Sequence, residues 1–162
     1  GSESVSAADN ELVVDEESRE ARLVSLVPLT LSFSETVSWA ERDPGNSDER
    51  PLAFYCFELV LVDGDGATVR RVDVGGPEEA VVLEGGVYGP PSIDGRTGRW
   101  LGGESAETKL YLPARAVEGA AAVRLVGIPM DGGITVSVEV DGRAGSTRFG
   151  TTDPGTFVID LA

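Results

Sequence analysis

The fold is decided by the stretch AFYCFELVLVDGDGATVRRVDV, residues 53–74. Its first ten residues are almost wholly apolar and rich in aromatic and β-branched side chains, which predicts a strand covered on both faces. Asp-Gly-Asp-Gly follows, and both residue types tolerate the positive φ angles of a tight turn. The next run, ATVRRVDV, is again strand-like, although the pair Arg70-Arg71 interrupts the alternation and suggests a bulge. The stretch therefore predicts a β-hairpin whose first strand lies in the middle of a sheet.

The same DGDG could instead hold calcium, because Asp63 and Asp65 have the spacing of the first two ligands of an EF-hand loop. That loop also needs an oxygen ligand at its fifth position, glycine at its sixth and an acidic ligand at its twelfth. Ala67, Thr68 and Val74 occupy those three positions. A turn is thus the stronger interpretation. Asp63 and Asp65 remain candidate ligands for Ca²⁺, and no other cofactor is expected.

Most of the remaining chain also has the pattern of short strands. Leu29–Phe33 alternates apolar and polar residues, although Pro28 argues against a central strand at that point. Ile134–Val140 alternates without a fault and is followed by Asp-Gly, a hairpin signal. Further strands are expected at 80–83, 108–112, 121–126, 146–149 and 156–161. Helix is expected only at 16–26 and 113–120.

These elements predict an all-β fold, an antiparallel β-sandwich or jelly roll with little helix. The 162 residues suffice for one domain with its own core. We assign residues 21–162 to that single domain and residues 1–20 to an acidic N-terminal arm that is flexible or adds a strand.

One part of the chain resembles a known kind of sandwich. TKLYLPARAVEGAAAVRLVGIP, residues 108–129, is followed by ITVSVEVDG, residues 134–142. This order of a strand, a short proline-led turn and two further strands with a hairpin resembles β-sandwich modules of the galactose-binding-like kind. The resemblance covers about a third of the chain, includes no diagnostic ligand residue and implies a carbohydrate as one candidate ligand.

The charge of the chain indicates the environment in which the protein works. It holds 28 acidic and 13 basic residues, a formal charge of −15, and Lys109 is its one lysine. Acidic side chains keep a protein hydrated and soluble in concentrated salt, which also screens their mutual repulsion. The composition therefore favours a halophilic protein, which we expect to be extracellular or at the cell surface. Nucleic acid is excluded as a partner, because phosphate binding needs a basic surface.

The chain has no histidine and one cysteine, Cys56, which lies within an apolar run. The usual general base and every imidazole-dependent triad are thus absent, so we predict that the protein is not an enzyme. A metal-dependent hydrolase with oxygen ligands is the second alternative. No run of apolar residues is long enough to cross a membrane.

A long glycine- and proline-rich segment, Glu84–Glu104, is the best place for a binding site, because long loops in compact domains often bind ligands. Aromatic rings there can cover a sugar or a partner while arginines pair with carboxylates. Trp100 could equally plug the end of the sandwich, and Trp39 could be core or an exposed anchor. The candidate binding residues are Tyr88, Arg96, Arg99, Trp100 and Trp39.

The N-terminal arm supplies a second candidate surface. Its apolar island Leu12, Val13 and Val14 could add a strand to the open sheet edge of a neighbour. We therefore expect a non-catalytic extracellular structural or interaction subunit of a halophile, in a cell-surface, filament or virion assembly. Its partners would be other copies of itself or another surface protein. The first alternative is a carbohydrate-binding module that uses Tyr88 and Trp100 to bind a glycan.

Overall fold

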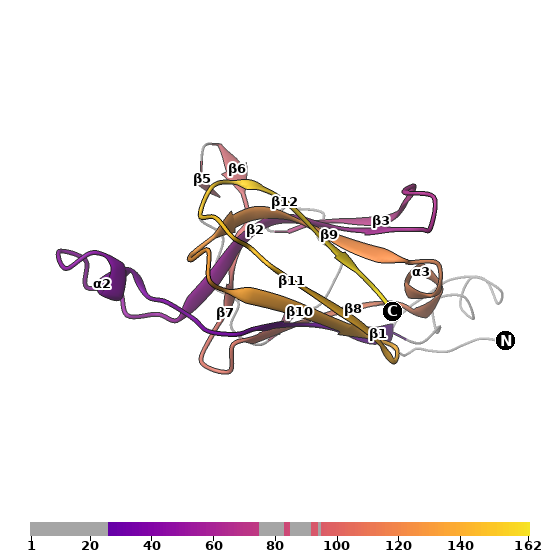
Figure 1. Ribbon diagram of the computed structural model, residues 1–162, viewed down its shortest axis with the longest axis horizontal. Helices are drawn as coiled ribbons and strands as arrows, with labels where there is room; N and C mark the ends of the chain where they lie inside the picture. The colour runs from indigo at the N-terminus through magenta and orange to yellow at the C-terminus, as the bar shows by residue number, and fades with distance from the viewer. Residues whose placement is uncertain (1–25, 75–82, 85–91, 94) are drawn as a thin grey trace, which may run out of the picture.

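The computed structural model describes residues 26–74, 83–84, 92–93 and 95–162. They form two antiparallel sheets packed face to face (Figure 1). Sheet I has the order β11-β10-β1-β8-β4, and sheet II has the order β12-β9-β2-β3 with β7 also paired to β2. The predicted all-β sandwich is confirmed.

The strands of sheet I are β1 (Leu26–Phe33), β4 (Leu83–Glu84), β8 (Glu107–Pro113), β10 (Thr135–Val140) and β11 (Arg143–Arg148). Those of sheet II are β2 (Leu52–Val62), β3 (Thr68–Asp73), β7 (Arg99–Gly102), β9 (Ala122–Pro129) and β12 (Gly155–Asp160). A separate short hairpin pairs β5 (Ser92–Ile93) with β6 (Arg96–Thr97). Two short helices complete the described residues, α2 (Trp39–Arg42) and α3 (Ala114–Glu118).

Strand β2 organises sheet II because it pairs along both of its sides. β9 lies along one side, while β7 and β3 share the other side. Every residue of β2 except Glu58 is buried. The prediction of a central strand covered on both faces is therefore confirmed.

The DGDG segment forms the predicted hairpin turn between β2 and β3. One carboxylate oxygen of Asp63 accepts hydrogen bonds from the backbone N–H groups of Asp65 and Ala67, both at 2.9 Å, and Gly66 has a φ of 85°. The bulge, however, does not lie at Arg70-Arg71, whose pairing with β2 is continuous. It lies closer to the turn, where Val62 pairs with Thr68. That shift brings Arg70 opposite the buried Leu61.

Pro28 lies in a central strand, contrary to the sequence expectation. β1 pairs with β8 from Leu26 to Ser32 but with β10 only from Leu29 onward. Phe33 donates its N–H toward the β8 side, to Ala106 O at 2.8 Å, so the alternation of the backbone turns the nitrogen of Pro28 toward β10. The N–H that Pro28 lacks would therefore lie just outside the β1–β10 ladder, so no hydrogen bond of that ladder is lost.

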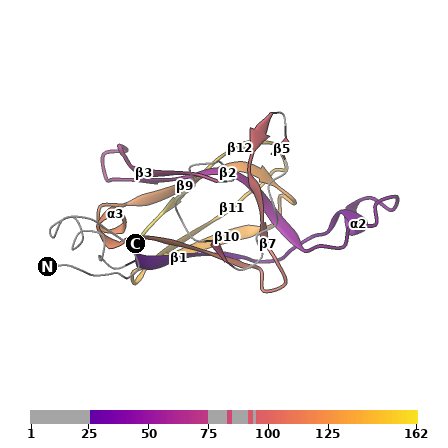
Figure 2. The ribbon, with the colours of Figure 1, turned by 180° about the vertical axis from the view of Figure 1, so that it is seen from behind.

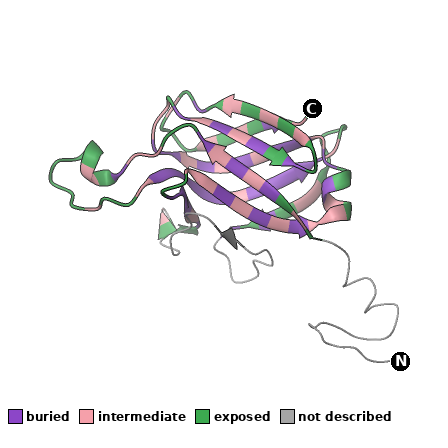
Figure 3. Cartoon of the chain, turned by 90° about the horizontal axis from the view of Figure 1, so that it is seen from below, coloured by how far each residue is buried: buried purple, intermediate pink, exposed green. Residues whose placement is uncertain are grey.

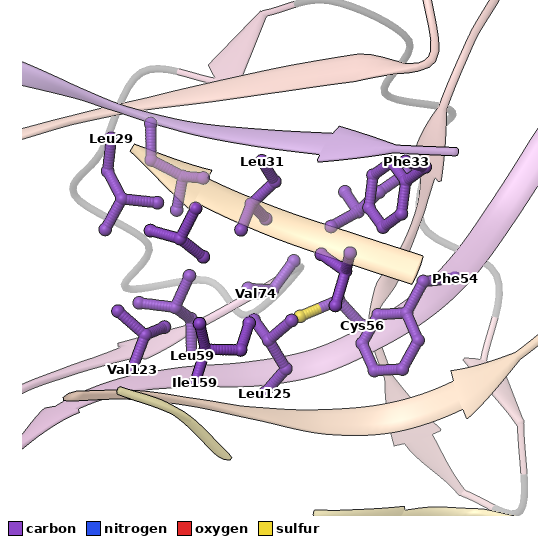
Figure 4. Packing of buried hydrophobic residues seen from close by; sticks show 14 of the residues in the cluster. Leu29, Leu31, Phe33, Phe54, Cys56, Leu59, Val74, Val123, Leu125 and Ile159 are labelled. Atoms are coloured by element: carbon purple, nitrogen blue, oxygen red, sulfur yellow. The ribbon is translucent and has the colours of Figure 1, made fainter. Parts of the chain in front are cut away.

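The core lies between the two sheets, where leucine and valine side chains of both inner faces interdigitate (Figure 4). Leu29, Leu31 and Phe33 of β1 face Leu59 and Leu125 of sheet II. The alternation predicted for 29–33 and 134–140 is thus explained, because every second residue of β1 and β10 enters this core. The single cysteine, Cys56, points into the same core, as expected.

One side of the sandwich is closed by β11 and β12. The backbones of Ala144 and Ala162 exchange two hydrogen bonds at 3.3 and 3.0 Å. Gly145 allows this approach, since a Cβ there would lie 1.9 Å from the carbonyl oxygen of Asp160. The opposite side is formed by β3 of sheet II and β4 of sheet I.

The other expected elements are largely found. Strands occupy most of 108–112, 121–126, 146–149 and 156–161, and α3 lies within the expected helix 113–120. Of the expected strand 80–83 only its last residue is described, within β4. Of the helix expected at 16–26, only Leu26 is described, and it begins β1. The arm, residues 1–20, lies outside the described residues.

Candidate interaction site

A row of aromatic side chains lies on the outer face of sheet II. Because Phe54 and Cys56 point into the core (Figure 4), the alternation of a strand directs Tyr55 and Phe57 to the other face. Their ring centroids are 5.3 Å apart at 82°. Trp100 is paired with Tyr55 across β7 and β2, with ring centroids 4.9 Å apart.

Trp39 ends this row from another part of the chain. Its ring meets that of Trp100 edge to face, with centroids 6.1 Å apart at 85°. Trp100 is only 6% exposed, whereas Trp39 is 38% exposed. The ring of Trp100 is therefore a support and offers no open face to a ligand. The sequence allowed Trp39 to be either a core residue or an exposed anchor, and the structure places it at the surface.

Gly98 makes the close packing of this row possible. A Cβ at this position would lie 2.5 Å from the carbonyl oxygen of Cys56 and 2.9 Å from the ring of Tyr55. The Tyr55 side chain is fully buried, and this burial raises the pKa of its hydroxyl, with a smaller opposing effect of the Gly98 backbone. The row is thus a rigid, water-excluded support for Trp39.

Trp39 lies at the start of a lobe, residues 38–51, that projects beyond the sandwich (Figures 1 and 3). Its two ends are held together by backbone hydrogen bonds between Val37 and Leu52, at 2.7 and 3.0 Å. α2 contains no buried residue, and most of the lobe is exposed (Figure 3).

Local polar contacts give the lobe its shape in place of burial. Ser38 and Glu41 form a reciprocal capping box at the start of α2. Asp48 receives three hydrogen bonds of 2.8–3.2 Å from the guanidinium of Arg50, and a fourth of 3.0 Å from the Arg50 backbone N–H. These bonds hold the pKa of the Asp48 carboxyl below its usual value. The lobe is therefore ordered before any partner binds.

Arg42 ties the lobe to the sandwich. Its guanidinium donates to the backbone carbonyl of Met130 and lies 3.8 Å from a carboxylate oxygen of Asp131. Both partners belong to the connection between β9 and β10. The orientation of Trp39 is thus fixed from two sides, by Trp100 and by this arginine.

The two candidate arginines lie at the other end of the row. Arg96, exposed on β6, has its guanidinium carbon 4.2 Å from the ring centroid of Phe57, a cation–π distance. Arg99 on β7 is half-buried opposite Cys56. Tyr88 and the assembly candidates Leu12, Val13 and Val14 lie outside the described residues.

The candidate calcium ligands, Asp63 and Asp65, lie in the hairpin turn between β2 and β3. Asp63 is half-buried and its carboxylate accepts two backbone N–H groups, while Asp65 is exposed. Among the described residues, no group of three or more acidic, cysteine or histidine side chains is arranged to hold a metal ion. Likewise, no helix in the described part of the chain is long and apolar enough to cross a membrane.

A second surface feature lies on the outer face of sheet I. Ser137 of β10 is paired with Ser32 of β1 on one side and with Ser146 of β11 on the other. This row of small hydroxyl side chains, with Glu139 and Ala144 beside it, lines a shallow hollow of about 550 Å³.

Sequence reasoning missed several of these residues. The capping box has a readable signature, Ser38-x-x-Glu41. Tyr55 and Phe57 are hidden in an apolar run, where nothing local tells which side chains leave the core. The serine hollow needs three strands from distant parts of the chain, so only the fold reveals it.

Comparison of the chain with models of protein families, with curated proteins and with solved structures finds no match.

Proposed function

We propose that this chain is a non-catalytic interaction subunit of an extracellular assembly of a halophile, and that the lobe at 38–51 contacts the partner. The observation that carries the proposal is the exposed Trp39 ring, held edge to face on the buried Trp100. The partner is another copy of the chain or another surface protein.

Tryptophan is the residue most enriched among those that dominate binding energy at protein interfaces. Trp39 is exposed on a lobe that is already ordered by its capping box and by the Asp48–Arg50 pair. Binding through such a lobe loses little conformational entropy, because its backbone and its anchor need not be ordered first.

The acidic composition fits an assembly that forms in concentrated salt. With 28 acidic and 13 basic residues, at least 15 carboxylates have no basic side chain of their own to pair with. Two such surfaces repel each other at low ionic strength. In molar salt the screening length falls to about 3 Å, so apolar and hydrogen-bonded contacts then decide association.

The test is the association of the purified chain in molar KCl, measured by sedimentation velocity over a range of concentrations. Trp39→Ala should weaken association by about tenfold or more. Val158→Ala, which removes another exposed apolar side chain, is the matched control and should leave association unchanged. The chain has only two tryptophans and Trp100 is buried. A blue shift of the exposed tryptophan emission on association therefore reports on Trp39.

Two outcomes would contradict the proposal. One is a wild-type chain that stays monomeric at every concentration and also captures no other surface protein through Trp39. The other is a Trp39→Ala variant that associates as tightly as the wild type.

A carbohydrate-binding module is the second candidate, and the serine row on sheet I favours it. Ser32, Ser137 and Ser146, together with Glu139, offer hydroxyl and carboxylate groups that can hydrogen-bond to a sugar. Ser137→Tyr fills the hollow and should abolish retention on polysaccharide columns in molar KCl, whereas Trp39→Ala should not. Failure of the wild type to be retained on any polysaccharide would eliminate this candidate.

A further inference from the structure

The edge of sheet II at β3 has backbone groups directed away from the sheet. β3 is the last strand of its sheet, and no strand of the described residues pairs with its outer side. Val74 donates its N–H to the carbonyl of Phe57 on β2 at 3.0 Å. By the alternation of an antiparallel ladder, the backbone groups of Arg71 and Asp73 point away from β2. They can pair with an added strand.

An arginine side chain also lies on each face of this edge. Arg70 lies opposite the buried Leu61, so its side chain is on the inner side of the sheet, and its buried Nε has no hydrogen-bond partner. Arg71 is on the outer side, 63% exposed, with its guanidinium 3.4 Å from Glu58. Two adjacent arginines are notable in a chain with so few basic residues.

We propose that residues 11–15 of a second copy, ELVVD, add a strand to β3. Alternation along this segment directs Leu12 and Val14 to one face and Glu11 and Asp15 to the other. With the apolar pair turned inward beside Val72, the carboxylates lie on the same face as Arg71. The inference rests on the proposed function, and it names the acceptor edge of the assembly.

The acidic charge of both copies makes docking of this strand depend on the salt concentration. Residues 1–20 hold seven acidic residues and one arginine, and the rest of the chain is acidic as well. Repulsion therefore opposes docking at low salt, while screening at molar salt leaves only contacts within about 3 Å. The main-chain hydrogen bonds of an added strand are short-range contacts that this screening does not weaken. Association through this edge should thus strengthen as the salt concentration rises.

The geometry is head to tail, because each copy donates one arm and accepts another. Two copies that exchange arms reciprocally form a closed dimer, whereas arms passed on from copy to copy produce a larger ring or an open filament. An arm that instead folded onto the β3 of its own chain would leave the protein monomeric.

The experiment mixes two full-length variants in molar KCl. The donor-only chain carries Arg71→Pro, which removes an N–H that points away from β2 and so leaves the β2–β3 ladder intact. The acceptor-only chain carries Leu12→Asp with Val14→Asp. Each should associate more weakly alone than the wild type, and the mixture should form a 1:1 heterodimer by sedimentation velocity. Where Arg71→Pro fails to fold, Arg71→Glu replaces it, with Arg148→Glu on β11 as the charge-matched control.

The outcomes separate this inference from the proposed function. A mixture that associates no more tightly than either variant alone, or single variants that associate like the wild type, overturns strand addition at β3. Should the single variants associate like the wild type while Trp39→Ala abolishes association, the proposed function stands without the β3 edge. A heterodimer that forms regardless of Trp39→Ala supports the edge and removes the lobe from the interface.

Discussion

The hairpin β2–β3 and the lobe at 38–51 are neighbours in the sequence, yet they are ordered by different physics. Every residue of β2 but Glu58 is buried, and its contacts come from strands far away in the chain. The lobe has almost no buried side chain and is shaped by hydrogen bonds between residues only a few positions apart. Burial therefore gives the sandwich its stability, while local polar contacts give the lobe a fixed shape at the surface.

The largest effect should come from removing buried volume in the sandwich. Leu125→Ala deletes a fully buried side chain between the sheets and should lower the free energy of unfolding by about 3 kcal/mol. Val158→Ala, half exposed on the neighbouring strand, should cost less than about 0.5 kcal/mol. Denaturant unfolding in molar KCl measures both. Equal losses in the two variants would contradict the assignment of the core.

Salt should have the next largest effect, and it should act on the sandwich as a whole. Between dilute and molar KCl we expect the free energy of unfolding to rise by about 2 kcal/mol, or roughly 5 °C in Tm for a chain of this length. The reason is the screening of a formal charge of −15. Thermal unfolding over a KCl series measures the rise. A Tm that does not depend on salt would remove the argument for a halophilic protein.

The contrast between local and long-range contacts also explains which parts of the structure the sequence predicts. Periodicity predicts β2, its turn and β10, because their apolar patterns are local consequences of facing a core. The periodicity fails for Arg70, because a bulge at Val69 changes which face each later residue of β3 occupies. Pro28 is tolerated in a central strand for a similarly non-local reason, the point at which the pairing with β10 begins.

The candidate site shows the same limit. The sequence identifies Trp39, Trp100 and Arg96 as candidate binding residues, but it does not predict that β7 lies beside β2. That pairing buries Trp100 against Tyr55 and leaves Trp39 as the exposed ring of the row. Burial of an aromatic residue thus depends on tertiary pairing that residue type does not reveal.

The smallest effect should be confined to the lobe and depend on pH. Because Arg50 holds the pKa of Asp48 below 3.8, the ionised pair stabilises the lobe at pH values above the unfolded value. This contribution is lost as the pH falls through the lower folded value. NMR titration of the Arg50 amide should therefore show a midpoint below 3.8, and Asp48→Asn should abolish the transition. Asp48 and Arg50 form an ion pair at the surface of the lobe, so the stability of the sandwich should hardly change through this transition. A titration midpoint at or above the usual value for aspartate would mean that this pair does not order the lobe, whose shape would then rest on the capping box of Ser38 and Glu41 and on the contact of Arg42 with Met130.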